Sequence, residues 1–181
     1  MKRIILLILT LVTTNLTCEF NGALTAGYLF KHDSNFKAVY GKGLPNLITA
    51  DGCYAFKEHW GAGAKVSYLR AHGETSFLQA ETLLQQVPVT FYLRRIENYD
   101  TGLQLYGSLG GGFSWIKEKS YLGNVGIYKG LGEAEIGLSY PMYRTCHFTT
   151  AFRYLFPHES HCGNQIDVGG FDFRAGLGFS W

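Results

Sequence analysis

The carboxyl-terminal segment, residues 171–181, alternates between two kinds of side chain up to its last position. The odd-numbered positions are apolar or aromatic and end in Phe179 and Trp181, whereas the even-numbered positions are charged or very small. Because successive side chains of a strand point to opposite faces of a sheet, this segment predicts a strand with one apolar and one polar face. Such a strand suits the wall of a barrel that separates lipid from a polar lumen.

The same period of two recurs along the chain and predicts an all-β protein. We expect strands at residues 20–31, 46–57, 59–71, 81–95, 102–116, 127–140, 145–156 and 166–181. Short turns at 57–59, 97–100 and 141–144 alternate with longer, polar loops at 32–45, 72–80, 117–126 and 157–165. Outer-membrane barrels have short periplasmic turns, longer outer loops and an even number of strands. The pattern therefore predicts an eight-stranded antiparallel up-and-down transmembrane β-barrel.

Parity assigns the side chains of these strands to two faces. The apolar face, which we expect to contact lipid, carries Phe20, Leu24, Ala26, Tyr28, Phe30, Trp60, Ala62, Ala64, Val66, Tyr68, Val87, Val89, Phe91, Leu93, Leu103, Leu105, Leu109, Phe113, Trp115, Ala134, Ile136, Leu138, Tyr140, Phe148, Phe152, Tyr154 and Phe156. The opposite face carries Asp51, Lys57, Lys65, Arg94, Gln104, Glu133, Glu135, His147, Arg153, Asp172 and Arg174.

A barrel of eight strands has an interior that side chains can fill, so charges inside it must pair with one another. We therefore expect a filled lumen with an ion-pair network. Its predicted members are Asp51, Lys65, Glu133, Glu135, Arg153, Asp172 and Arg174. The many glycines, among them Gly110, Gly111 and Gly112, are interpreted as space for a tightly curved wall. A phosphate-binding loop at these three glycines is disfavoured because no helix follows them.

The amino terminus predicts export from the cytoplasm. Residues 1–18 combine Lys2 and Arg3 with a short apolar run, which is typical of a cleaved signal peptide, with cleavage expected between residues 17 and 22. A lipoprotein signal at Cys18 is disfavoured, since Leu16 lies two residues before it instead of three. Residues 19–181 form the predicted barrel domain.

Charge and cysteine content exclude some partners. Loss of Lys2 and Arg3 lowers the basic count from 16 to 14, equal to the 14 acidic residues, so no nucleic-acid partner is expected. Cys53, Cys146 and Cys162 are an odd number in an oxidising compartment, so at least one thiol stays free or pairs between chains. Neither a metal site nor a cofactor is predicted.

The ending of the chain resembles the carboxyl-terminal insertion signal of bacterial outer-membrane proteins, through Arg174, Gly176, Phe179 and Trp181. With the eight-strand layout, the chain after the signal resembles small outer-membrane barrels of the OmpA/OmpX type. The resemblance implies a place in the bacterial outer membrane, contact with its lipid and lipopolysaccharide, and recognition by the barrel-assembly machinery. Members of this family include adhesins, structural barrels, narrow passages and lipid-modifying enzymes, so the fold leaves the activity open.

Three patterns suggest chemistry. His158-Glu159-Ser160 resembles the His-x-Ser of outer-membrane lipid A 3-O-deacylases, in which histidine activates serine, although the Asn-Ala that follows there is replaced here by His161-Cys162. His158, His161 and Cys162 could also form a metal cluster, but without a matching partner set. Glu133 and Glu135 point the same way and could act as an acid–base pair. The alternative is that both belong to the ion-pair network. A filled lumen favours this alternative, because it leaves no cleft between the carboxylates for a glycan.

These observations leave three functions open. The favoured one is a non-enzymatic outer-membrane barrel with a structural or adhesion-type role, in which four outer loops contact a surface partner. The alternatives are a lipid A 3-O-deacylase-like hydrolase that uses His158 and Ser160, and a narrow channel for small solutes. A soluble lipocalin-like barrel is the rival fold, and it would require the apolar face to point inward.

Overall fold

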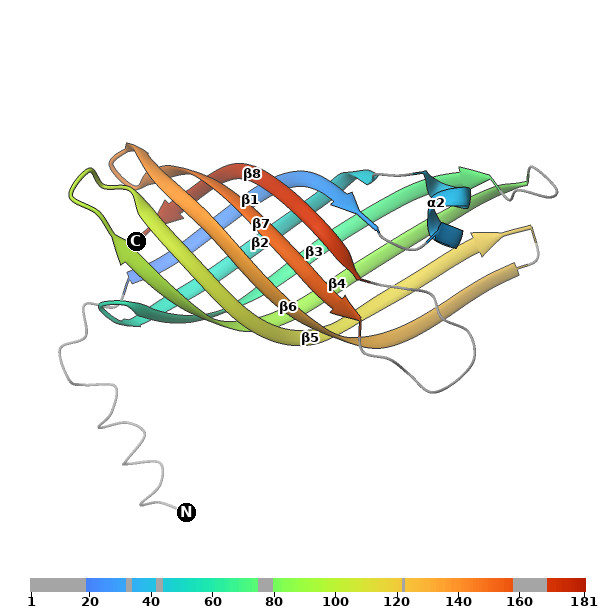
Figure 1. The fold of residues 1–181 in the computed structure, drawn as a ribbon, viewed down its shortest axis with the longest axis horizontal. Coiled ribbons are helices and arrows are strands. Elements are labelled where there is room, and N and C mark those ends of the chain that lie inside the picture. The colour runs from blue at the N-terminus through green and yellow to red at the C-terminus, as the bar shows by residue number, and fades with distance from the viewer. Residues whose placement is uncertain (1–18, 32–33, 42–43, 75–79, 122, 158–168) are drawn as a thin grey trace, which may run out of the picture.

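The computed structural model describes residues 19–31, 34–41, 44–74, 80–121, 123–157 and 169–181. Within these residues, eight antiparallel strands form a closed barrel in sequence order (Figure 1). The elements are β1 (Glu19–Phe30), α2 (Ser34–Tyr40), β2 (Leu44–Lys57), β3 (Trp60–Glu74), β4 (Glu81–Asn98), β5 (Gln104–Ser120), β6 (Gly123–Tyr143), β7 (Cys146–Pro157) and β8 (Gly170–Ser180). The ring closes because β8 pairs with β1 from Phe171 to Ser180. The predicted fold class is confirmed.

The two ends of the barrel differ. The β2–β3, β4–β5 and β6–β7 turns lie at the same end as the start of β1 and the carboxyl terminus, and we call this end periplasmic. In the β4–β5 turn, Gly102 adopts a φ of 79° and its N–H donates to the carbonyl oxygen of Tyr99 at 2.8 Å. The opposite end, called the outer end below, carries α2 and the tips of the β3–β4 and β5–β6 hairpins (Figure 1).

Two expectations about the outer end were wrong. Residues 117–126 were expected to be a loop, but β5 and β6 continue through most of this segment, and Ser120 pairs with Gly123. A hairpin that rises above the lipid has water available to both faces, so its sequence lacks the alternation that marks a membrane strand. Residues 34–40, inside the expected 32–45 loop, form α2.

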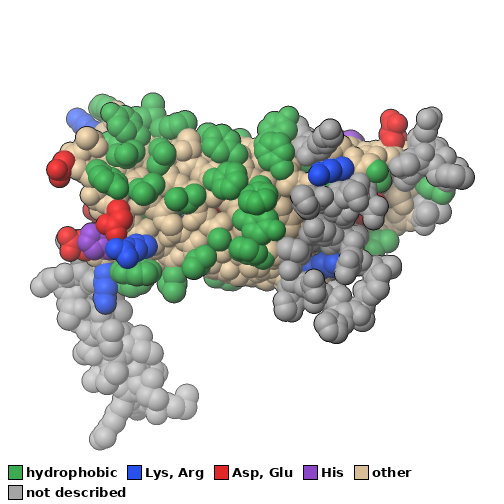
Figure 2. All heavy atoms as spheres, in the orientation of Figure 1, with side chains coloured by type: hydrophobic (Ala, Val, Ile, Leu, Met, Phe, Trp, Pro, Cys, Tyr) green, Lys and Arg blue, Asp and Glu red, His purple; other side chains and the backbone are tan. Residues whose placement is uncertain are grey.

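The side chains of the wall follow the predicted parity. Exposed apolar and aromatic side chains cover the outside, including Leu24, Phe91, Leu109, Ile136 and Phe173. Figure 2 shows hydrophobic side chains spread over the middle of the visible face, with charged side chains near its ends. A continuous apolar exterior of this kind requires lipid around it. The lipocalin-like alternative is wrong, because the apolar face points outward.

Lys57 departs from this pattern. It was expected inside, but it is exposed at the β2–β3 turn. The ladder between β2 and β3 shifts by one residue between Ala55 and Lys57, which places Lys57 opposite the outward-facing Trp60. A bulge of this kind reverses the parity of every residue beyond it. The described part of the chain contains no helix that is both long and apolar enough to span a membrane.

Candidate functional site

Eight charged side chains meet in the middle of the lumen, and we call them the lumen network. Four are basic and four are acidic, so their formal charges cancel: Lys65, Arg94, Arg153 and Arg174, with Asp51, Glu133, Glu135 and Asp172. None of these side chains is more than 10% exposed. They come from six strands, β2, β3, β4, β6, β7 and β8.

Glu135 and Lys65 form the centre of the lumen network. The Nζ atom of Lys65 lies 2.8 Å from Oε1 of Glu133 and 2.6 Å from Oε2 of Glu135. Arg174 donates a hydrogen bond to Glu135, and Nη2 of Arg94 lies 3.5 Å from Oε1 of Glu135. Glu135 is therefore contacted by three cations at once.

A second chain of contacts runs along β7 and β8. The Nε atom of Arg153 lies 2.6 Å from Oδ2 of Asp172, and Nε of Arg174 lies 3.1 Å from Oδ1 of Asp172. Nη1 of Arg153 also lies 3.5 Å from Oε2 of Glu133. Arg153 and Asp172 are direct cross-strand neighbours, so the backbone register itself holds this ion pair together.

Aromatic side chains complete the network toward the periplasmic end. Nη2 of Arg94 lies 2.5 Å from Oδ2 of Asp51, and the Tyr92 hydroxyl donates to the same carboxylate. The guanidinium of Arg94 lies 4.6 Å from the centre of the Tyr92 ring and 4.2 Å from that of Tyr106. Cation–π contacts add to the ion pair where water is excluded. The Nζ atom of Lys65 also lies 4.6 Å from the Tyr92 ring centre.

Glycines make room for these aromatic rings. A Cβ atom on Gly63 would overlap the Tyr92 hydroxyl, and one on Gly137 would overlap the Tyr106 ring. Gly110 and Gly112 lie within β5, where a Cβ atom would strike the backbone of β4. The segment is therefore part of the wall and does not form a phosphate-binding loop.

The structure places all seven residues predicted for the network inside the lumen and brings them into one cluster. Sequence reasoning placed Arg94 on the inward face but did not include it in the network. Its partner Asp51 lies on β2, two strands away from β4, and pairings across the ring cannot be inferred from parity. Glu133 and Glu135 both contact Lys65 and have fully buried side chains, so they have no open cleft in which to act as an acid–base pair.

An apolar layer closes the lumen between the network and the outer end. Its buried members are Leu29, Phe36, Leu44, Leu47, Leu69, Ala71, Leu84 and Ile116, with Tyr40 and Ile127 packed against them. Phe36 belongs to α2, so the helix contributes a side chain to the seal. We call this set the outer apolar layer.

Polar contacts fix α2 over the outer apolar layer. The Tyr40 hydroxyl donates to Oε1 of Glu118 at 3.0 Å and lies 3.1 Å from the Thr82 hydroxyl. Burial raises the pKa of Tyr40 to about 12, and the neighbouring Glu118 adds to this shift. On the lumen side, Nζ of Lys31 lies 4.3 Å from the Phe36 ring centre and donates to Oε1 of Gln86 at 3.2 Å.

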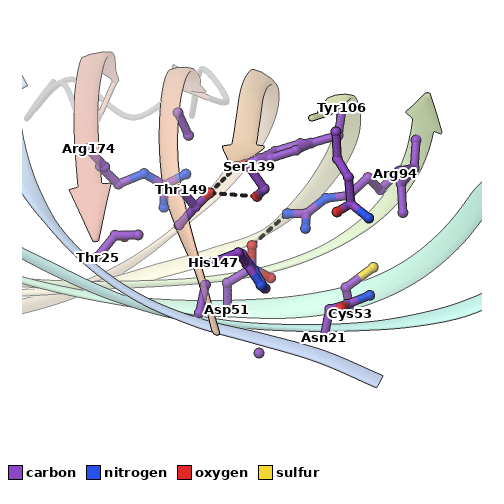
Figure 3. A pocket seen from close by; sticks show the side chains of 15 residues that line it. Asn21, Thr25, Asp51, Cys53, Arg94, Tyr106, Ser139, His147, Thr149 and Arg174 are labelled. Carbon is purple, nitrogen blue, oxygen red and sulfur yellow. Dashed lines mark hydrogen bonds and ion pairs between the residues drawn. The ribbon is translucent and has the colours of Figure 1, made fainter. Parts of the chain in front are cut away.

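At the periplasmic end the lumen holds a small cavity (Figure 3). Its volume is about 30 Å³, and its lining includes Asn21, His147, Tyr106, Arg94 and Arg174. This is room for about two water molecules. In Figure 3, Arg94 extends toward Asp51. The cavity thus leads only as far as the lumen network.

The cysteines and the predicted hydrolase residues add no second site among the described residues. Cys53, buried, and Cys146, half-buried, are both free thiols. Within the described ranges, no three His, Cys, Asp or Glu residues are grouped so that they could hold a metal ion. His158, Ser160, His161 and Cys162 lie outside the described residues.

The residues of the predicted insertion signal lie on both faces of β8. Phe179 and Trp181 are exposed on the outside, and Arg174 is buried in the lumen. A Cβ atom on Gly176 would strike the backbone of β1. Trp181 exchanges backbone hydrogen bonds with Phe20 at 2.9 and 3.2 Å, which closes the ring at the periplasmic end.

Comparison with solved structures gives matches over nearly the whole chain. The crystal structure of Ail, the attachment invasion locus protein of Yersinia pestis, has a TM-score of 0.58 at 18% identity and covers 91% of this chain and 97% of its own. The outer membrane protein OprG of Pseudomonas aeruginosa has a TM-score of 0.66 at 15% identity, covering 92% and 97%. Neisserial surface protein A has a TM-score of 0.62 at 10% identity, covering 89% and 96%. No protein-family model and no curated protein matches the chain.

At these identities the likeness establishes the fold. The chain has the fold of the small eight-stranded outer-membrane β-barrels, as the resemblance to the OmpA/OmpX type predicted. A closed ring without unpaired edges, an apolar exterior and a charged interior are what a barrel needs in lipid. The protein is therefore an integral β-barrel of a bacterial outer membrane.

Proposed function

We propose that this protein is a sealed barrel that acts through its outer surface and does not conduct solutes. The outer apolar layer carries this proposal. An ion that crossed it would lose most of its water of hydration and meet few polar groups, of which the Lys31 ammonium and the Gln86 side chain are already hydrogen-bonded to each other, so the crossing is strongly unfavourable. The lumen network below it is a second closure, because its buried charges are already paired with one another.

The exposed part of the β5–β6 hairpin supports a role in surface interaction. Tyr121 is 56% exposed and Val125 is 55% exposed at its tip, beyond the part of the wall that lipid covers. Apolar side chains on the part of a hairpin that extends into water are available for contact with another molecule. Among the similar structures, Ail bears the name attachment invasion locus protein and was also solved in complex with the heparin analogue sucrose octasulfate. These observations favour an adhesion-type partner at the outer end.

Planar-bilayer recording tests the seal. The purified, folded protein should show no conductance steps, and detergent-solubilised samples should migrate differently on gels before and after boiling, which verifies that the barrel is folded. Reproducible steps that change in size in a Glu133→Gln variant would establish the narrow channel and overturn the proposal.

Attachment assays test the surface role. Bacteria that express the protein should adhere to an epithelial cell monolayer several times better than bacteria with an empty vector. A Tyr121→Ser/Val125→Ser variant should lose most of this gain. A matched Met142→Ser/Tyr143→Ser variant removes two exposed apolar side chains at the periplasmic end and should retain it. Equal adhesion with and without the protein would contradict the surface role.

The hydrolase alternative makes the opposite prediction for lipid chemistry. If His158 and Ser160 form a catalytic pair, the purified protein releases fatty acid from lipopolysaccharide and Ser160→Ala abolishes the release. Our proposal expects no release from the wild-type protein.

A further inference from the structure

A groove crosses the lipid-facing wall of the barrel between β3 and β7, and we call it the wall groove. Its volume is about 670 Å³, within the range of about 300–1,000 Å³ found for sites that hold small molecules. Ser108 and Glu135 border the wall groove, but their side chains are buried in the lumen, so these two residues contribute only backbone to its floor. Its sides are formed by large side chains, among them Trp60, Leu93, Ile136 and Phe152.

Gly107 of β5 lies at the bottom of the wall groove. Many glycines of this barrel make room for a neighbouring strand, but a Cβ atom on Gly107 would meet only the carbonyl oxygen of Glu135, at an ordinary distance of 3.9 Å. The packing of the barrel therefore does not require a glycine at this position. Its cross-strand neighbours are Arg95 and Ile136, so the missing side chain leaves a hollow between two long ones.

The wall groove begins near the periplasmic end of the barrel and continues into the membrane. Arg95, which lines it, lies close to the periplasmic end of β4, whereas Phe152 lies in the middle of β7. Trp60, the first residue of β3, pairs with Arg95. Tryptophan gathers at the boundary between acyl chains and headgroups. The wall groove is therefore charged at the headgroup level of the periplasmic leaflet and apolar beyond it.

Arg95 keeps donors for an anion. Its Nη2 and Nε atoms lie 2.7 and 2.8 Å from one oxygen of Glu97, Oε1, and both side chains are exposed. An exposed ion pair of this kind contributes little free energy. The guanidinium carries further N–H groups in a fork that matches the oxygens of a phosphate. A phosphate can therefore share Arg95 with Glu97 or replace that carboxylate.

We infer that the wall groove holds a phospholipid of the periplasmic leaflet, with its phosphate at Arg95 and one acyl chain over Gly107. An anionic head with an apolar chain matches a groove that is charged at its periplasmic end and apolar along the rest. Association within lipid depends on close packing, and a chain in a hollow makes more van der Waals contacts than a chain on a convex wall. The bound lipid fills the space that Gly107 leaves open.

Native mass spectrometry of the protein released from detergent tests this inference. In a titration with dioleoyl phosphatidylglycerol, the folded wild-type protein should retain one phospholipid. It should bind dioleoylglycerol, which has the same chains and no phosphate, severalfold more weakly. Arg95→Gln should weaken binding of the phospholipid about fivefold, the effect of removing one cation near a membrane surface. Gly107→Leu fills the hollow with a side chain and should also weaken binding severalfold.

Two matched variants separate the wall groove from general lipid contact. Arg144→Gln removes another exposed cation at the periplasmic end, and Ala26→Leu enlarges an exposed apolar side chain on β1. Neither residue lines the wall groove, and both variants should bind the phospholipid as the wild type does. Heat-modifiable migration verifies that each variant is folded.

Two results would overturn the inference. The first is equal binding of the phospholipid by the wild type and Gly107→Leu, or equal binding of the two lipids by the wild type. The second is a protein dimer in the mass spectrum that Gly107→Leu abolishes, which would assign the wall groove to a second copy of the chain. Neither result depends on whether the lumen conducts or whether the outer end binds a partner.

Discussion

At the scale of single residues, the barrel depends on the balance of charge in its lumen. A buried ion pair gains little over a well-packed apolar pair, but a buried charge without its partner is strongly destabilising. The four cations and four anions of the lumen network share partners closely. Removing any one of them therefore leaves another buried charge without a partner, which is destabilising. Removing a cation together with its anionic partner should therefore cost less stability than removing either one alone.

Arg153 and Asp172 test this balance. Arg153→Met removes the cation that contacts both Asp172 and Glu133, and should lower the free energy of unfolding by about 3–5 kcal/mol. The double variant Arg153→Met/Asp172→Leu restores neutrality and should recover most of that loss. Urea unfolding of the protein folded in detergent, followed by circular dichroism, measures both. Equal destabilisation by the single and the double change would contradict the argument.

The buried hydroxyl of Tyr40 should make the stability of the folded protein depend on pH. Its pKa is raised by burial from the usual 10.0 to about 12 in the folded protein, so between these values the folded state keeps a proton that the unfolded state has lost. The contribution of the Tyr40 hydroxyl to the free energy of unfolding is fully present below pH 10 and is lost as the pH rises toward 12. Wild-type protein should therefore lose more stability than Tyr40→Phe between pH 9.5 and about 11.5. Parallel urea midpoints for the two proteins would contradict the burial of this hydroxyl.

At the scale of elements, the sequence predicted the strands that lie in the membrane and missed the structured segments that lie above it in water. Within the membrane, every second side chain must be apolar, so the eight strands and their parity could be read directly. The upper part of β5 and β6 has no such constraint and was taken for a loop, and α2 is too short for a helical period to show. The side on which Arg94 lies was predictable, but its pairing with Asp51 depends on how the ring closes.

Loss of the aromatic side chains at the end of β8 should impair assembly of the barrel. If Phe179 and Trp181 are read by the assembly machinery, Phe179→Ala/Trp181→Ala should reduce the folded protein in outer membranes severalfold. Tyr140→Ala/Phe148→Ala removes two exposed aromatic side chains from β6 and β7, with a similar loss of lipid contact but an intact ending. Quantification of the heat-modifiable band in isolated outer membranes measures both variants. Equal loss in the two would attribute the effect to lipid contact and contradict a signal role.

At the scale of the whole molecule, the lumen is closed twice along its axis. The outer apolar layer excludes ions because its side chains are mostly apolar and its buried polar pair, Lys31 and Gln86, is already hydrogen-bonded. The lumen network excludes them because its charges are already neutralised by partners. Two barriers in series mean that opening one leaves the other to stop the current. The cavity at the periplasmic end is consistent with this arrangement, since it reaches Arg94 and Arg174 and goes no further.

This arrangement predicts a non-additive effect on conductance. Leu69→Ala/Leu84→Ala thins the outer apolar layer and Glu135→Ala/Arg174→Ala removes one cation and one anion of the lumen network, and each double variant should remain silent in planar bilayers. The quadruple variant should show conductance steps, because water can then enter both levels. Heat-modifiable migration of every variant verifies that the barrel is intact. Conductance in either double variant alone would mean that a single layer forms the whole barrier, and that the other serves only to fill the space between the strands.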